Sequence, residues 1–164
     1  MIHEYIIDSN IFISSHRVYY PFDLMPTYWE YLLKLSEENI CILVDEVHKE
    51  IMKNDDELSR WFEANKESFD IKSSKDDRIV NAYSSIITNV MSSSTYSQQA
   101  KSVFASCTDS WIIAHALANK YTIVTNELRQ VGAKNRVMIP NVCEEFGIRY
   151  IKMTEFLRET GFRV

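Results

Sequence analysis

Short, mostly apolar segments separated by longer amphipathic stretches limit the folds open to this chain more than any other feature. These segments are residues 4–8, 40–44, 121–125 and 148–152, of which 40–44 is apolar throughout. A strand buried on both faces is typically such an uninterrupted apolar run, and parallel strands require long crossovers, usually helical. We therefore predict an α/β fold with a central parallel sheet and helices on both of its faces.

The stretches between these segments show helical periodicity and helix-end signals. Helices are predicted from Asp45 onward and over 56–69, 76–91, 109–120 and 154–160. Capping-box patterns are formed by Thr27 with Glu30 and by Asn141 with Glu144. Pro26 suits a first helical turn, and Gly147 suits a helix end. Residues 91–99 are interpreted as a flexible connection or a helix start.

Composition narrows the class of protein. The 164 residues predict one domain over 1–164, and the apolar content of 46% is ordinary for a globular protein. The three cysteines are widely spaced, which favours neither a disulfide framework nor a zinc site. The three glycines cannot form a dinucleotide or P-loop motif. No apolar run has the length of a membrane span and the N-terminus lacks signal-peptide features, so we expect a cytoplasmic protein.

Acidic residues stand where the predicted strands end or where the next helices begin. Asp8 ends the first strand, Asp45 and Glu46 follow the second, Asp109 opens a helix and Glu127 follows the third strand. Because the carboxyl ends of parallel strands lie along one edge of a sheet, these acids are expected to converge. Adjacent carboxylates repel one another, and Mg²⁺ or Mn²⁺ would compensate that charge. One or two such ions can activate water for phosphodiester hydrolysis.

Four motifs in this order resemble a PIN-domain ribonuclease: "IIDSNIF", "VDEVHKEI", "CTDSWIIAHA" and "IVTNE". The chain is most similar to the VapC-like branch of toxin–antitoxin nucleases and, within it, to the DUF4411 family. The final segment "IPNVCEEFGIRYIKMTEFL" also resembles that family, so the likeness covers essentially the whole chain. It implies a PIN-like three-layer α/β/α fold, a Mg²⁺ or Mn²⁺ cofactor and an RNA substrate.

The resemblance also implies roles for individual residues. The catalytic and metal-binding acids would be Asp8, Glu46, Asp109 and Glu127. Glu127 departs from the family pattern, which has aspartate at this place. Hydrogen bonding to the carboxylates would fall to Ser9, Asn10 and Thr125. The basic residues Arg129, Lys134 and Arg136 are candidates for RNA contact, although a solvated loop is the slightly favoured explanation for them.

Simpler explanations exist for the acids. Asp8 and Asp109 could be helix caps, and Glu46 could favour a helix N-terminus through the dipole, with Asp45 as the cap. The function predicted is a metal-dependent endoribonuclease, the toxin of a toxin–antitoxin pair, with RNA, a cognate antitoxin and a second copy of the chain as partners. Alternatives are a catalytically inactive PIN-like RNA- or protein-binding module, or a phosphatase with Asp8 as nucleophile. Asn10 argues against the phosphatase alternative, because such enzymes require a second acid two residues after the nucleophile.

Overall fold

A computed structural model describes residues 3–164 and contains a four-stranded sheet in the order β2-β1-β3-β4. The strands are β1 (Tyr5–Ile7), β2 (Cys41–Ile42), β3 (Thr122–Val124) and β4 (Tyr150–Ile151). Every neighbouring pair is parallel. The prediction of an α/β fold with a central parallel sheet is therefore confirmed.

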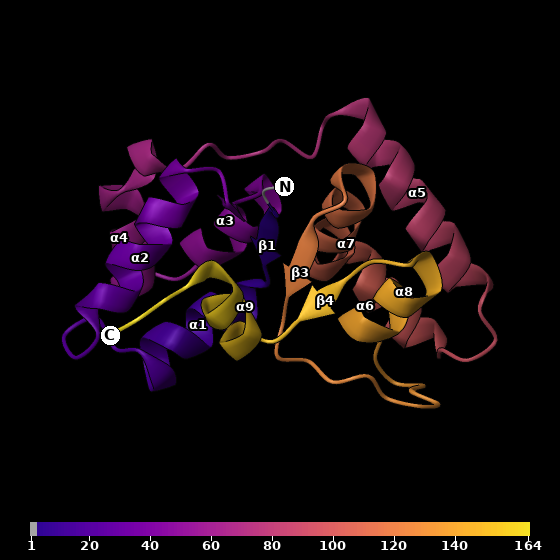
Figure 1. The fold of residues 1–164 in the computed structure, drawn as a ribbon. Helices are drawn as coiled ribbons and strands as arrows, with labels where there is room; N and C mark the ends of the chain where they lie inside the picture. The colour runs from indigo at the N-terminus through magenta and orange to yellow at the C-terminus, as the bar shows by residue number, and fades with distance from the viewer. Residues whose placement is uncertain (1–2) are drawn as a thin grey trace.

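Helices flank the sheet and form the outer layers of an α/β/α arrangement (Figure 1). The α-helices are α1 (Ser9–Ser14), α2 (Pro26–Glu37), α3 (Asp45–Met52), α4 (Glu57–Ala64), α5 (Asp77–Ser92), α6 (Gln98–Ser106), α7 (Thr108–Asn119), α8 (Ile139–Phe146) and α9 (Met153–Thr160). A π-helical turn spans Ser15–Tyr19, and a 3₁₀ turn spans Lys66–Ser68. In Figure 1, α2, α4 and α9 lie to one side of the strands, and α5, α6 and α8 to the other.

The strand register places the polar residues that follow β1 and β3 at the same edge of the sheet. Tyr5 pairs with Thr122 and Ile7 with Val124, so β1 and β3 end at the same level. The backbone N–H of Asp8 continues the ladder by donating to the Val124 carbonyl at 3.0 Å. The strands are buried because their side chains face helices on both sides. The residues that directly follow β1 and β3 therefore emerge side by side at the carboxyl edge of the sheet.

The predicted capping boxes are wrong. Helix α2 already begins at Pro26, whose fixed φ suits the first helical position, so Thr27 lies inside the helix. Helix α8 likewise begins at Ile139, and the Asn141 side chain instead bonds the backbone N–H and C=O of Gln130 at 3.0 and 2.7 Å. Helix α3 begins at Asp45 itself, and Val44 occupies its N-cap position without a side-chain cap hydrogen bond.

Other boundaries differ by small amounts. Strand β2 is shorter than the apolar run 40–44, because after Ile42 the chain pairs with Lys72, through an isolated parallel bridge at Val44. Helix α6 occupies part of a region for which the sequence indicated only a possible helix start. Gly147 ends α8 with a φ of 67°, as expected. No helix within residues 3–164 has the length and apolarity needed to cross a membrane.

Candidate functional site

Asp8 is the buried centre of the carboxyl edge, with 1% of its surface exposed. One carboxylate oxygen accepts the backbone N–H of Asn10 at 3.2 Å, which caps α1. The other accepts the Thr125 hydroxyl at 3.0 Å, from the residue that follows β3. Asp8 therefore does cap α1, and it also contacts the residue that follows β3, so the cap does not take it away from the carboxyl edge.

Asp109 faces this edge from the first turn of α7. The pKa of its carboxyl is raised to about 7, first by burial and then by the charges of Asp8 and Glu127, against the lowering effect of Arg136. The pKa of Asp8 is likewise raised to about 6, mainly by burial and in part by the charge of Glu127, although the hydrogen bonds from Asn10 and Thr125 lower it. Both pKa values are raised, so the negative charge of each carboxylate is only partly compensated by its surroundings.

Glu127 lies beyond β3 at the start of α8. One of its carboxylate oxygens accepts the backbone N–H of Ile139 at 2.8 Å, and the other forms an ion pair with Arg136. The same Arg136 guanidinium lies 3.9 Å from the Asp109 carboxylate. Glu127 is therefore part of the acid cluster, and Arg136 is the cation placed between two of its members.

Helix α3 contributes Glu50 to the cluster, whereas Glu46 lies apart from it. Glu46 pairs with Lys49 at 3.0 Å. Glu50 accepts a hydrogen bond from the Ser9 hydroxyl, and its charge raises the pKa values of Asp8 and Asp109. The expectation that Glu46 converges with the other acids is not met, because Glu50, one helical turn later, faces them. The sequence held a signal for this, since residues four apart share a helix face.

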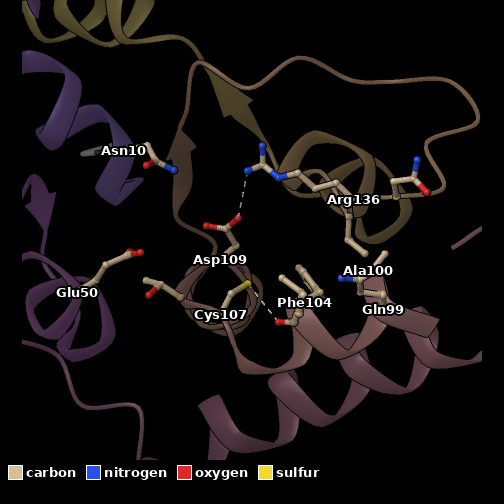
Figure 2. A pocket seen from close by; sticks show the side chains of 12 residues that line it. Asn10, Glu50, Gln99, Ala100, Phe104, Cys107, Asp109 and Arg136 are labelled. Carbon is tan, nitrogen blue, oxygen red and sulfur yellow. Dashed lines mark hydrogen bonds and ion pairs between the residues drawn. The ribbon is translucent and has the colours of Figure 1, made fainter. Parts of the chain in front are cut away.

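Two adjoining hollows surround the cluster. The larger, of about 440 Å³, is lined by Asp109 and Glu50 among others, and the smaller, of about 300 Å³, by Asp8 and Glu127. Asn10 and Arg136 line both. Figure 2 shows Asp109 at the middle of the larger hollow, with Arg136 above it and Glu50 and Asn10 facing from another side. Each of these acids thus borders a hollow, although Asp8 itself is almost fully buried.

The remaining predicted polar residues have varied positions. Ser9 contacts Glu50, and Thr125 contacts Asp8 as expected of an orienting residue. Arg129 pairs with Glu144, away from the hollows, while Lys134 is exposed in the loop before α8. Of the three basic candidates, only Arg136 reaches the acids.

The donor set fits a hard divalent cation in chemistry but is not drawn together around one point. Carboxylate oxygens are the ligands that Mg²⁺ prefers, and the pKa values of Asp8 and Asp109 are raised by burial first and by the neighbouring acids second. Within residues 3–164, no three His, Cys, Asp or Glu side chains are arranged closely enough to share an ion. The Arg136 guanidinium supplies part of the missing charge.

This fold, with a four-stranded parallel sheet between helices and acids at its carboxyl edge, is PIN-like. It is similar to a chain of a solved structure described as "Crystal structure of VapBC2 from Rickettsia felis bound to a DNA fragment from their promoter". The TM-score is 0.55 at 14% identity, and the match covers 90% of this chain and 97% of that one. Residues 5–164 match the family described as "Domain of unknown function (DUF4411)", so the chain belongs to that family. The comparison with curated proteins gave no significant match.

Proposed function

We propose that the protein is a metal-dependent endoribonuclease that hydrolyses RNA phosphodiester bonds in the cytoplasm. The observation that carries the proposal is the cluster of buried acids at the carboxyl edge, in which burial and mutual repulsion raise the pKa values of Asp8 and Asp109. Such a cluster is costly for folding unless a cation joins it. A costly, accessible group of acids is typical of a functional site.

Asp8, Asp109, Glu127 and Glu50 would hold Mg²⁺ or Mn²⁺, with Glu46 as the more distant candidate. The ion would supply an activated water and positive charge at the scissile phosphate. The protein itself orients the acids: Thr125 and the Asn10 backbone fix Asp8, and the Ile139 N–H fixes Glu127. Arg136, at the junction of the two hollows, can leave the acids and contact a phosphate oxygen.

We also propose that the protein is the toxin of a toxin–antitoxin pair. The support is the PIN-like fold, shared with a chain from a VapBC2 complex. The sequence singled out Tyr19, Tyr20 and Phe22 as a possible contact for an antitoxin or a second copy of the chain. Of these, Tyr20 and Phe22 stack on Tyr28 and Trp29, whereas Tyr19 is 64% exposed. Tyr19 is therefore the member of this group that remains available to either partner.

Cleavage of a mixed cellular RNA by the purified protein tests the activity. Wild type with Mg²⁺ or Mn²⁺ should cut RNA, while Asp8→Asn and Asp109→Asn should retain the fold and lose at least about 100-fold in rate. Asp55→Asn is the matched control, because the Asp55 side chain is 97% exposed and its ion pair with Arg60 lies on the surface. Full cleavage by both site variants would exclude this assignment.

A catalytically inactive PIN-like binding module is the second candidate. It is favoured by the position of Arg136, whose guanidinium already pairs with Glu127 beside Asp109. Titration calorimetry with Mn²⁺ separates the two functions. The nuclease should bind Mn²⁺ in a manner that Asp8→Asn removes, and the inactive module should show no such carboxylate-dependent binding.

A further inference from the structure

The larger hollow has two chemically different ends. One end is polar and acidic, formed by Asn10, Glu50 and Asp109. The other end is apolar and is formed mainly by α6 and the segment before α8: Ala100, Val103, Phe104 and Val137. Figure 2 shows the labelled α6 residues on the side of the hollow away from Glu50 and Asn10. An acid cluster alone does not require this second, apolar end.

We propose that the α6 end of this hollow is a subsite for one unpaired nucleobase of the RNA, next to the phosphate that is held at the acid cluster. The inference rests on the proposed nuclease function and extends it by naming the part of the substrate that this surface binds. It also predicts a preference for single-stranded over double-helical RNA, because a paired and stacked base cannot enter a hollow.

The size and the apolar wall of the hollow suit a base. Its volume of about 440 Å³ falls within the range typical of small-molecule sites. Val103 is 58% exposed although it is apolar, while Phe104 beneath it is only 2% exposed. Bases extruded from a strand are held by apolar and aromatic surfaces against their faces. An exposed valine beside the acid cluster provides such a surface.

Two side-chain amides complete the apolar end. Gln99 lies on α6 and Asn135 in the loop before α8, and both line the hollow and are exposed. Within residues 3–164, neither side-chain amide makes a hydrogen bond to the protein. A carboxamide carries both a donor and an acceptor, which is the combination that reads the edge of a base. These amides are therefore free to bond a base that rests on Val103.

Arg136 lies between the acidic end and the apolar end of the larger hollow, as the phosphate of a bound nucleotide would lie between the acids and its base. It lines both hollows, lies 3.9 Å from Asp109 and follows Asn135 directly in the chain. A phosphate bound by Arg136 would lie at the acids, and the base attached through its sugar would point toward Asn135 and α6. The positive charge is thus next to the phosphate, and the neutral amides are next to the neutral base.

The test compares the double variant Gln99→Ala/Asn135→Ala with the control Gln98→Ala/Asn81→Ala, which removes the same two amides from exposed positions that do not line the hollow. Both pairs are placed in the inactive Asp8→Asn protein. Fluorescence anisotropy then measures binding of a single-stranded RNA oligonucleotide and of a duplex of the same sequence. The subsite pair should weaken single-strand binding about tenfold and leave duplex binding unchanged, because a good pair of base-edge contacts contributes about that much.

A second measurement uses proteins with Asp8 intact and sequences the ends of the RNA products. The subsite pair should relax the preference for the nucleotide beside the cut, whereas the control pair should keep it. Equal single-strand affinities for the subsite pair and the control pair would overturn the nucleobase subsite. Cleavage that persists in Asp8→Asn would instead overturn the nuclease site, so the two failures are distinguishable.

Discussion

The Arg136 guanidinium lies 3.9 Å from the Asp109 carboxylate while it forms an ion pair with Glu127. One exposed side chain from a loop therefore supplies positive charge to two acids that come from different elements. Arg136 lowers the pKa of Asp109, but burial and the neighbouring acids still hold that pKa at about 7. The cluster is thus only partly neutralised by the protein itself, and this property leads to the first two predictions.

Arg136→Gln is expected to tighten Mn²⁺ binding about tenfold, because the guanidinium and a metal ion compete for the same carboxylates. The same variant should weaken RNA binding, since a phosphate contact is lost. Titration calorimetry measures the first effect and anisotropy the second. Arg129→Gln is the matched control, because Arg129 pairs with Glu144 outside the cluster. Weaker Mn²⁺ binding in Arg136→Gln would show that Arg136 supports the site instead of competing for it.

The raised pKa values of the acid cluster predict that the folding stability of the metal-free protein depends on pH. Asp109 titrates at about 7 when folded, against an ordinary value of 3.8. Its protonated form is therefore favoured by folding, and stability is lost as the pH rises from about 4 through 7. Asp109→Asn should consequently be more stable than wild type by about 2–4 kcal/mol at pH 8 and by little at pH 4.5.

Urea unfolding at several pH values measures this difference. The comparison is made between variants because His115, whose pKa burial lowers to about 4, contributes a pH dependence of opposite sign that is common to all of them. Asp55→Asn should show no such gain, and added Mn²⁺ should reduce the gain of Asp109→Asn. If Asp109→Asn were stabilised equally at pH 8 and pH 4.5, the ionised form of Asp109 would not be the cause of the lower stability of wild type.

Glu50 and Glu46 form a natural pair of variants. Glu50 bonds Ser9 and lies near Asp8 and Asp109, whereas Glu46 pairs with Lys49. Glu50→Gln should lower RNA cleavage by about 100-fold or more, and Glu46→Gln by less than about threefold. The measurement is the RNA cleavage rate of both purified variants at one Mg²⁺ concentration. The reverse order of effects would restore Glu46 as the metal-binding glutamate.

The difference between these two glutamates illustrates what the sequence can and cannot predict. Apolar runs locate the strands, and parallel pairing then brings Asp8, Asp109 and Glu127 to one edge without further information. Glu46 and Glu50 lie on the same face of α3, so the position of the helix along its own axis decides which of them lies beside the other acids. The motif therefore indicated the helix that faces the acid cluster, but not that Glu50 and not Glu46 bonds Ser9 there.

Loop conformation was the other property that sequence patterns did not predict. Arg136 reaches the acids because the polar segment after β3 returns toward α8, and such a segment carries no periodic signal. The apolar end of the larger hollow was likewise unforeseen, since only two of the nine residues of α6, Val103 and Phe104, are large and apolar. Its role in the site follows from its position beside α7, not from its composition.

Thr125 provides the last prediction, because its hydroxyl donates to Asp8 at 3.0 Å and thereby lowers the pKa of that carboxyl. Thr125→Val keeps the shape of the side chain but removes the donor, so the pKa of Asp8 should rise above its value of about 6. Mn²⁺ binding measured against pH should then have its acidic midpoint shifted upward by on the order of one unit, the effect of one hydrogen bond to a charged group. Thr125→Ser, which restores the donor, should return the midpoint to the wild-type position. If both substitutions shifted it equally, the packing of the threonine methyl group and not its hydroxyl would control Asp8.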